Sequence, residues 1–440
     1  MSRLSYFAAF CLLLGGCSEV SSDSSSSDSR VCEFEVQHYE DEGTLVLNTR
    51  EIDYLMRGDI IDAPVSLATK SNGARVWILP TALQQNGKIY LSHTVVEGDL
   101  ANISDAKITV VDEEQMFIDS KNLELKTNGF QWVTNIVQVP SGLLALVHSE
   151  YTGEDGFFGM DCSIIDELER CAPGYSQIGL AWLPNDKFEA DNYEFTFLGN
   201  IAGSYTKLPH FNVHGTPWYY TQDENGEKYL NLLFADAHYI QLEDGSWMPH
   251  ETGGQRIGRL RYDFDKLMVD IEAGRIGDWQ KLTVEGWKEP DALPSLPIIP
   301  KVPEMEEVDP RIAAGEVIVH SDAIFHEPSN SYFLSTYTLG GKKSRYGSKF
   351  AFYNSCDGES WEYIDTYHTR KEGKSGWSYL TLVASDDTDH GVSRGDFDLI
   401  TGWEYGKPDR KVLRMKTSVG DGCSCPQKKN RLSNMSLYEP

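Results

Sequence analysis

The chain has 440 residues, of which 40% are hydrophobic, 11% aromatic and 24% charged, and this composition excludes a wholly disordered or fibrous protein. Its 39 Lys and Arg face 67 Asp and Glu, for a formal charge of −28. Phosphate binding needs clustered cations, so this charge argues against nucleic acid as a partner. The 38 glycines and 22 tyrosines favour turn-rich β structure over a helical bundle.

The first 16 residues have the pattern of an export signal. Arg3 supplies a positive charge, and residues 7–14 form an apolar run that is too short to span a membrane as a permanent helix. Residues 14–17 (LGGC) resemble the bacterial lipobox, in which the cysteine, here Cys17, is lipidated and becomes the mature N-terminus. The alternative is an ordinary secretory signal with a cysteine there by chance.

A serine-rich stretch follows the signal. Residues 17–31 cannot bury a core and predict a flexible tether. Ser18, directly after the cysteine, resembles lipoproteins sorted to the outer membrane. We therefore expect a lipid-anchored protein of the bacterial cell envelope.

Six cysteines remain once Cys11 leaves with the signal and Cys17 takes the lipid. An even number in an exported protein indicates disulfides. Cys162 and Cys171 enclose a short loop and are expected to pair.

The other four cysteines lie near the two ends of the body or in its last third. Cys32 stands at the start, and Cys423 and Cys425 stand near the end, so we expect a bond that joins the termini. The connectivity of these three and Cys356 stays open. The Cys-Ser-Cys motif alone lacks the histidine ligands of a metal site.

Hairpin signals recur along the body, each followed by a second pair of strands. The fifth unit lacks a strand, which residues 33–38 or 45–48 could supply. Residues 264–273 are the best helical candidate. The hairpins turn at Asn72-Gly73, Ser141-Gly142, Asn225-Gly226, near Ser329-Asn330 and in a longer polar turn within 379–403. The second pairs are 88–93 with 107–112, 178–183 with 193–198, 258–264 with 279–284, and 349–355 with 360–366. In the fifth unit, 411–416 is the one strand of this pair that the sequence places there.

These five four-stranded units, starting near residues 60, 133, 214, 320 and 377, are typical of a β-propeller. We predict one all-β, five-bladed propeller over residues 32–425, followed by a tail at 426–440. A seven-bladed propeller is the alternative. Residues 355–361 (SCDGESW) resemble the Asp-box turn of sialidase-like propellers, in which the Asp caps the turn and the Trp packs beneath it.

Three short segments resemble the five-bladed propeller glycosidases, the architecture of arabinanases, β-xylosidases and fructosidases. They are 178–182 (IGLAW), 320–323 (HSDA) and 377–380 (WSYL), within a resemblance that covers about 59–419. In that family an Asp of the first inner strand acts as base or nucleophile, a second carboxylate orients, and a Glu acts as acid. The resemblance implies a glycan substrate and no required cofactor, and a structural Ca²⁺ would suit an acidic propeller.

The resemblance assigns roles to residues at one mouth of the propeller, where the inner strands start. Asp62 matches the base or nucleophile, Asp322 the orienting group, and Glu150 or Asp236 the acid. Trp377 and Tyr379 would be platforms for sugar rings. The sequence departs from the family at Asn135 and His214, where acids are expected.

Two other functions remain open. A polysaccharide lyase would cleave uronic-acid-containing glycans by β-elimination. The third function is a non-catalytic glycan-binding propeller. Known propeller lyases, such as ulvan lyases, have more blades. The lyase would use His148 or His214 with Tyr337 or Tyr379 as base and acid, and Arg259 as donor to the substrate carboxylate, together with the neighbouring Arg256 and Arg261.

The same residues also have structural explanations. Asp62 could equally cap a turn, and His148 and His214 could be core or rim histidines. The only close histidine pair with ligand spacing is His210 and His214, in a loop that enters a strand, and whether a metal binds there stays open.

Overall fold

The computed structural model divides the chain into residues 1–31 and 32–440, and every described residue belongs to the second unit. Asp62, His214 and Cys17 lie outside the described residues. The structure describes residues 32, 34–36, 44–48, 75–85, 87–96, 104–112, 117–122, 130–151, 162–165, 168–171, 175–190, 193–203, 210–213, 218–223, 225–241, 247–249, 256–290, 295–296, 298–299, 318–338, 349–368, 377–384, 391–404 and 411–426.

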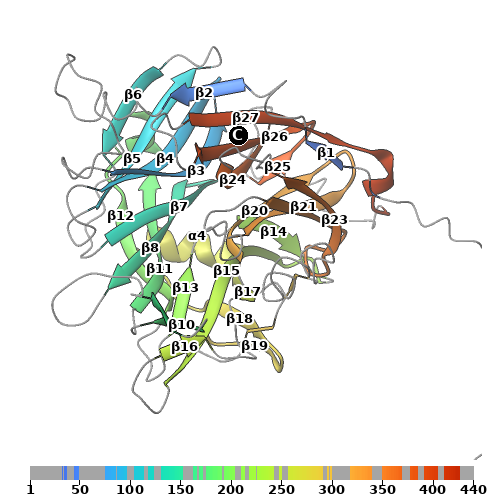
Figure 1. Ribbon diagram of the computed structural model, residues 1–440. Coiled ribbons are helices and arrows are strands. Elements are labelled where there is room, and N and C mark those ends of the chain that lie inside the picture. Colours follow the sequence, from blue (N-terminus) through green and yellow to red (C-terminus); the bar gives the residue numbers. More distant parts are fainter. Residues whose placement is uncertain are drawn as a thin grey trace, which may run out of the picture. The chain divides into compact units, whose positions relative to one another are not determined.

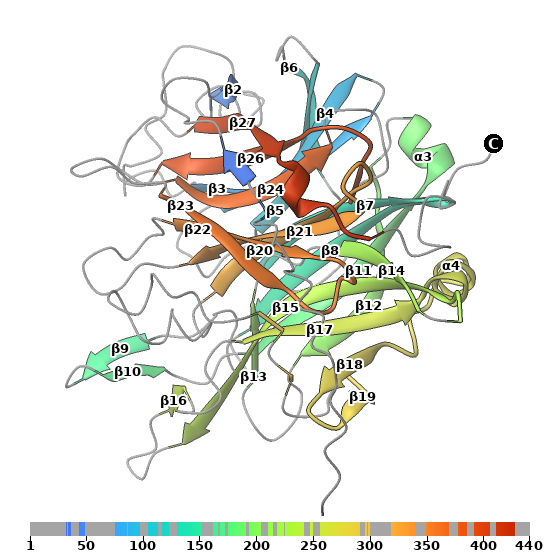
Figure 2. The same cartoon turned by 90° about the vertical axis from the view of Figure 1, so that its right-hand side faces the viewer.

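The described residues form five separate, mainly antiparallel sheets with two short α-helices, which agrees with the all-β prediction (Figures 1 and 2). The first sheet has the order β3 (Arg75–Gln85), β4 (Lys88–Val96), β5 (Ser104–Asp112) and β6 (Phe117–Asn122). The predicted pairing of 88–93 with 107–112 is confirmed as β4 with β5.

The first sheet contains a hairpin and a strand that the sequence did not predict. The β3–β4 hairpin turns at Gly87, whose φ of 69° suits glycine. The predicted turn at Asn72-Gly73 lies outside the described residues, and in the sequence Gly87 is also preceded by an asparagine. Strand β6, which was not predicted, takes the fourth place.

The second sheet matches the prediction in all four strands. Its order is β12 (Thr196–Gly203), β11 (Tyr175–Pro184), β8 (Gly142–Tyr151) and β7 (Phe130–Val139). At the β7–β8 turn, a Cβ on Gly142 would lie 2.0 Å from the Leu183 carbonyl oxygen, so only glycine fits. The five-residue helix α3 (Asn185–Glu189) follows β11.

Strand β15 (Lys228–Gln241) organises the third sheet. Strand β14 (Trp218–Gln222) forms the predicted hairpin with it, across a turn at Gly226 with φ 87°. On its other side lies β17 (Arg256–Asp263), followed by β18 (Gln280–Thr283). Smaller strands complete the sheet: β13 (His210–Val213), β16 (Trp247–Pro249), β19 (Gly286–Lys288), β10 (Leu168–Cys171) and β9 (Cys162–Ile165).

The predicted helix is present as α4 (Phe264–Glu272). Asp263 caps it by accepting the backbone N–H of Lys266 at 2.7 Å. Phe264, Leu267 and Ile271 are buried at helical spacing, so one face of α4 packs on the third sheet.

The fourth sheet has β23 (Glu362–His368), β22 (Lys349–Ser355), β21 (Ser331–Thr338) and β20 (Ile318–His326) in that order, as predicted. Asn330, with φ 50°, makes the turn between β20 and β21. The short strand β25 (Val392–Ser393) pairs in parallel with β20.

The fifth sheet joins the two ends of the body. Strands β24 (Trp377–Ala384), β26 (Phe397–Glu404) and β27 (Lys411–Val419) follow one another. Both predicted candidates for the missing strand are present, because β1 (Phe34–Val36) and β2 (Thr44–Asn48) pair with different parts of β27.

Contacts link each sheet to the next. Strand β3 contacts β7 and β24, β24 contacts β20, and β20 contacts β14. Strand β11 contacts β13, which joins the second sheet to the third. The fifth sheet thus contacts the first, and the contacts run through all five sheets and return to their start.

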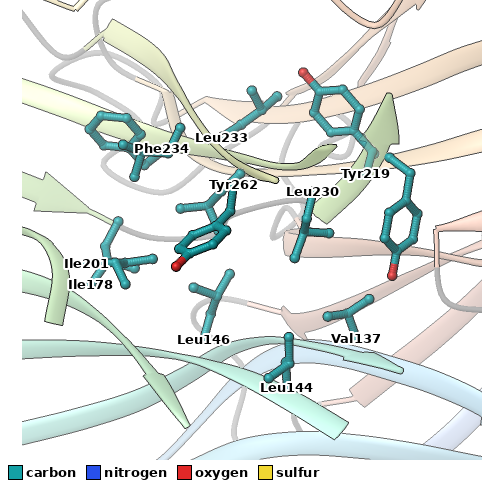
Figure 3. Packing of buried hydrophobic residues seen from close by; sticks show 14 of the residues in the cluster. Val137, Leu144, Leu146, Ile178, Ile201, Tyr219, Leu230, Leu233, Phe234 and Tyr262 are labelled. Atoms are coloured by element: carbon teal, nitrogen blue, oxygen red, sulfur yellow. The ribbon is translucent and has the colours of Figure 1, made fainter. Parts of the chain in front are cut away.

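The largest core cluster joins the second, third and fourth sheets. Figure 3 shows Leu144 and Leu146 of β8 facing Leu230 of β15 and Tyr262 of β17, all fully buried or nearly so. Burying each such side chain stabilises the fold by roughly 1.5–3 kcal/mol. Smaller clusters join the first and second sheets and the fourth and fifth.

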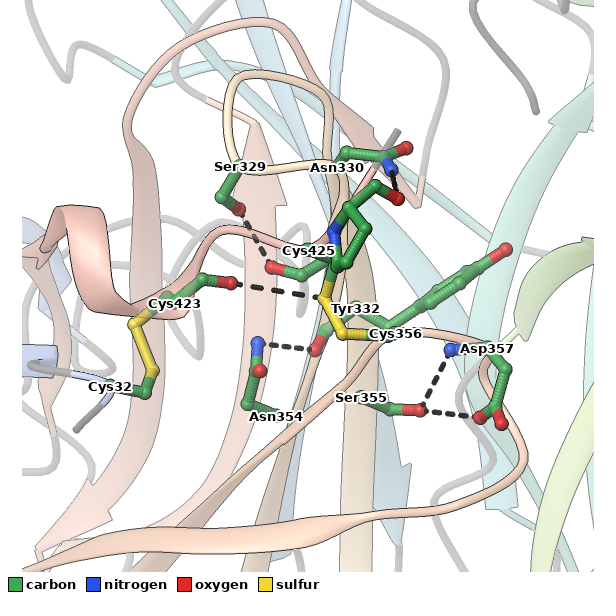
Figure 4. The surroundings of a disulfide bond; sticks show 12 residues. Cys32, Ser329, Asn330, Tyr332, Asn354, Ser355, Cys356, Asp357, Cys423 and Cys425 are labelled. Carbon is green, nitrogen blue, oxygen red and sulfur yellow. Dashed lines mark hydrogen bonds between the residues drawn. A yellow bond between two sulfur atoms is a disulfide. The ribbon is translucent and has the colours of Figure 1, made fainter. Parts of the chain in front are cut away.

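Two disulfides lie at the end of the chain (Figure 4). Cys32 bonds Cys423, which confirms the expected link between the termini, and Cys356 bonds Cys425. Cys162 and Cys171 are directly opposite each other on β9 and β10, and their side chains lie outside the description. The pairing of these two cysteines remains a prediction.

Candidate functional site

A carboxylate lies where the first strands of three sheets meet. Asp322 is the fifth residue of β20, and its side chain is 1% exposed. Its Oδ1 accepts Asn135 Nδ2 of β7 at 3.3 Å, and its Oδ2 accepts the Thr381 hydroxyl of β24 at 2.5 Å. Asp322 therefore links the second, fourth and fifth sheets through side chains alone.

Two backbone groups complete the shell of Asp322. The N–H of Leu382 donates to Oδ2 at 2.7 Å, and the N–H of Ala323 donates to Oδ1 at 2.9 Å. Each oxygen thus accepts two hydrogen bonds, as an ionised carboxylate prefers. The three residues that follow Asp322 in β20, Ala323, Ile324 and Phe325, are apolar and buried. The carboxyl therefore lies next to the hydrophobic core.

Burial dominates the electrostatics of this carboxyl. Desolvation raises the pKa of Asp322 to about 6, although the hydrogen bonds from Thr381, Leu382, Ala323 and Asn135 act in the opposite direction. A carboxyl with such a pKa can hold or release a proton close to neutral pH. Ser335, opposite Asp322 on β21, has a buried hydroxyl with no hydrogen-bond partner among the described residues.

Six of the residues predicted for the site are described through their backbone pairing alone. His148 and Glu150 lie towards the end of β8, where Glu150 is opposite Phe130. Asp236 in β15 is opposite Asn212 and Arg256. Tyr337 is near the end of β21, and Trp377 and Tyr379 are in the first half of β24. The roles proposed for them, and for Asp62 and His214, remain predictions.

Arg259 sits at the boundary between the third and fourth sheets, and its side chain is only 1% exposed. Its Nε donates to Asn231 Oδ1 at 2.8 Å, and its Nη1 lies 3.1 Å from Glu359 Oε1. The rings of Tyr219 and Trp287 lie 5.9 Å and 5.1 Å from the guanidinium carbon. Arg259 thus links β17 to the 355–361 turn through its Nε and Nη1 groups, and its predicted role in binding substrate remains a prediction.

The turn that holds Glu359 has the geometry expected of an Asp-box. Asp357 Oδ1 accepts the backbone N–H groups of Glu359 and Ser360, at 2.8 and 2.7 Å. Trp361 is buried and lies edge-on to Tyr219, with ring centroids 5.9 Å apart. Tyr219 in turn donates its hydroxyl to the Gly358 carbonyl at 2.8 Å. Asp357 thus caps the turn and Trp361 packs beneath it against Tyr219, so this motif joins the fourth sheet to the third.

The described residues contain no group of three or more His, Cys, Asp and Glu that is arranged to hold a metal ion. No helix in the described part of the chain is long and apolar enough to cross a membrane.

Known proteins resemble this chain only distantly. No family model matches the sequence, and no curated protein does either. Among solved structures, one described as a glycoside hydrolase has 11% identity and a TM-score of 0.43 over 87% of this chain and 98% of its own. The GH43_1 enzyme from Xanthomonas citri complexed with xylose has 12% identity and a TM-score of 0.39, over 83% and 92%. Trypanosoma rangeli sialidase has 9% identity and a TM-score of 0.34, over 78% and 55%. These TM-scores are all below 0.5, so the likeness is weak.

Sequence reasoning missed two partners of the site. Thr381 donates a hydrogen bond to Asp322, whereas from the sequence roles in that strand were assigned to Trp377 and Tyr379 only. The register of β24 shifts between Trp377 and Ser378 and again between Ser378 and Leu380, so counting alternate residues fails there. Glu359 was also missed as the partner of Arg259, because 100 residues separate them and no local pattern links the two.

Proposed function

We propose that this protein is a carbohydrate-active enzyme, a glycoside hydrolase on a five-bladed β-propeller. The observation that carries the proposal is the buried carboxyl of Asp322, held between strands of three different sheets. Burying a carboxyl in this way is unfavourable, and carboxyls with a shifted pKa cluster at functional sites.

The five sheets and their contacts support the propeller. Each sheet contacts its neighbours, and the fifth contacts the first through β24 and β3. The fifth sheet combines strands from both ends of the body, because β1 and β2 pair with β27 and so cover an edge of β27 that would otherwise be free. The Asp-box turn at 355–361 adds a feature typical of propeller blades.

Glycoside hydrolysis needs two carboxyl groups whose protonation states differ. In this proposal Asp62 is the base or nucleophile, and Glu150 or Asp236 is the acid. Asp322 is a positioning residue, since its exposed fraction of 1% and four hydrogen bonds leave no atom free for substrate. Trp377 and Tyr379 would stack on sugar rings.

The experiment is a screen of plant, algal and bacterial polysaccharides, with two readouts. Hydrolysis gives new reducing ends without near-ultraviolet absorbance, whereas β-elimination gives both. Asp62→Asn, Glu150→Gln and Asp236→Asn should lower kcat by orders of magnitude, since acid–base groups contribute about 10²–10⁴-fold each. Glu272→Gln, an exposed carboxyl-to-amide change on α4, is the control and should leave turnover unchanged. New absorbance with every active substrate, or no cleavage of any, would overturn the hydrolase assignment.

We also propose that Cys17 carries a lipid that holds the protein on the cell envelope, at the outer membrane. Support comes from the lipobox-like residues 14–17 and from the serine-rich segment after them. Expression of the full chain in a bacterium with labelled palmitate tests this. Label should enter the wild type and not Cys17→Ala, and the wild type should sediment with outer-membrane vesicles. Equal labelling of both proteins would contradict the anchor.

A further inference from the structure

A second arginine on the third sheet is held rigidly and keeps two donors unused. Arg261 lies on β17, two residues after the buried Arg259 and on the same face of the strand. Its guanidinium carbon is 3.9 Å from the centre of the Trp287 ring and 4.3 Å from that of Tyr229. Tyr229 comes from β15 and Trp287 from β19, so the two rings approach from opposite sides of β17.

A hydrogen bond fixes the remaining freedom of this side chain. Arg261 Nε donates to Gln280 Oε1 of the adjacent strand β18 at 3.0 Å. Two rings and one amide thus hold the guanidinium, and its Nη1 and Nη2 have no hydrogen-bond or ion-pair partner among the described residues. A guanidinium held in place loses little entropy when it binds an anion.

The nearby carboxylates already have partners. Glu359 pairs with Arg259, Glu227 accepts the Tyr229 hydroxyl at 2.7 Å, and Glu285 lies 3.6 Å from Lys288 Nζ. Asp223 Oδ1 accepts two backbone N–H groups of its own turn. Glu359 and Asp223 act on the charge of Arg261 from a distance, and none of these acids forms an ion pair with it among the described residues.

The surroundings are open and suited to a sugar. Arg261, Trp287 and Tyr229 are all partly exposed. Beside Trp287, a Cβ built on Gly286 would meet no atom within 4 Å, so space is free at the β18–β19 turn. A partly exposed indole next to a free pair of N–H donors offers an apolar surface for sugar C–H groups and a fork for two oxygens.

From this geometry we propose that Tyr229, Arg261, Gln280 and Trp287 form a binding site for the carboxylate of a uronic acid residue. The two Nη groups of Arg261 bind the two carboxylate oxygens, and Trp287 contacts the sugar ring. The site uses β15, β17, β18 and β19 and shares no residue with the shell of Asp322. It would let the protein hold an acidic glycan whether or not that glycan is cleaved.

Calorimetry on the full folded protein tests the ligand class first. The probes are a galacturonic acid trisaccharide, the same trisaccharide as its methyl ester, and a sulfated galactose trisaccharide. The wild type should bind the free acid at least about tenfold more tightly than the ester, since the ester lacks the charge. Equal affinity for acid and ester, tighter binding of the sulfated sugar, or no binding of any probe would each overturn the proposal.

Variants then test the residues. Arg261→Gln should weaken binding of the free acid about tenfold or more, and Arg261→Lys should weaken it as well because a lysine lacks the planar fork. Trp287→Leu should weaken binding of acid and ester together. Arg394→Gln, which removes an exposed arginine next to Glu327, is the matched control and should bind as the wild type does.

The outcome is separate from that of the proposed hydrolase. A trisaccharide can bind at Arg261 without turnover, and a hydrolase can act without this site. Thermal melting of each variant shows whether it is folded. If Arg261→Gln melts like the wild type and binds the free acid equally well, the site is refuted.

Discussion

Asn135 and Asp322 are 187 residues apart in the chain, and their side chains meet at 3.3 Å in the interior. Each lies near the middle of the first strand of its sheet. An amide thus stands beside the carboxyl at a place where the glycosidase resemblance would lead one to expect a second acid. The pair contains one negative charge at most, which avoids the repulsion of two buried carboxylates.

The first prediction concerns the pH dependence of stability through Asp322. Its pKa is raised from 3.8 to about 6 on folding, so the folded state holds this proton more tightly than the unfolded state does. The resulting stabilisation is complete below pH 3.8 and is lost as the pH rises through about 6. Compared with Asp322→Asn, the wild type should lose about 2 kcal/mol of unfolding free energy between pH 4 and pH 7. Urea unfolding at both pH values measures this. A difference between the two proteins that does not change with pH would contradict it.

The second prediction concerns Thr381. Thr381→Val keeps the shape of the side chain and removes the hydroxyl that donates to Asp322 Oδ2. The free energy of unfolding at pH 7 should fall by about 1–3 kcal/mol, because a buried carboxylate loses a partner. That hydrogen bond lowers the pKa of Asp322, so the pH at which stability levels off should move upwards. Thr196→Val, at an exposed position in β12, should change neither quantity.

The third prediction is an asymmetry between Arg259 and Glu359. Arg259→Met leaves the Asn231 amide oxygen buried without its donor and should cost about 2–4 kcal/mol in unfolding free energy. Glu359→Gln should cost about 1 kcal/mol or less, since this side chain is 57% exposed and an amide oxygen can still accept from Arg259. Equal losses in the two variants would show that the ion pair itself carries the stability.

The fourth prediction compares the two disulfides by the length of chain that each closes. Cys32–Cys423 spans 391 residues and Cys356–Cys425 spans 69. The longer loop restricts the unfolded chain more, so replacing both of its cysteines by serine should cost about 1.5 kcal/mol more than the same change in the shorter one. Changing cysteines in pairs avoids a free thiol. Urea unfolding of the two double variants gives the comparison, and a larger loss from the Cys356–Cys425 pair would refute the entropic account.

Much of the strand order could be predicted from the sequence, because turn chemistry is local. Asn225-Gly226 and Ser141-Gly142 mark hairpins that the structure contains. The first sheet shows the limit of such signals. The sequence has Asn-Gly pairs at 72–73 and at 86–87, and both have the sequence of a hairpin turn. The prediction used only the first pair, whereas β3 and β4 are joined at the second.

The site was less predictable than the fold. Asp322 could be singled out because residues 320–323 (HSDA) resemble the start of an inner strand of the propeller glycosidases, and the structure places it in the interior. Its partners come from β7 and β24, far away in the sequence, and irregular register hid Thr381. The contacts of Arg261 could not be predicted either, because Tyr229, Gln280 and Trp287 lie on three other strands.

The pairing of β1 and β2 with β27 has a consequence for the order of events during synthesis. The first strands of the body, at 34–36 and 44–48, must wait for their partner at 411–419, which is synthesised long after them. Until then β26 has one edge uncovered, and Cys32 has no Cys423 to meet. A nascent chain therefore completes its fifth sheet only after the strands of the other four sheets have been made, so a partly synthesised chain exposes an unpaired strand edge.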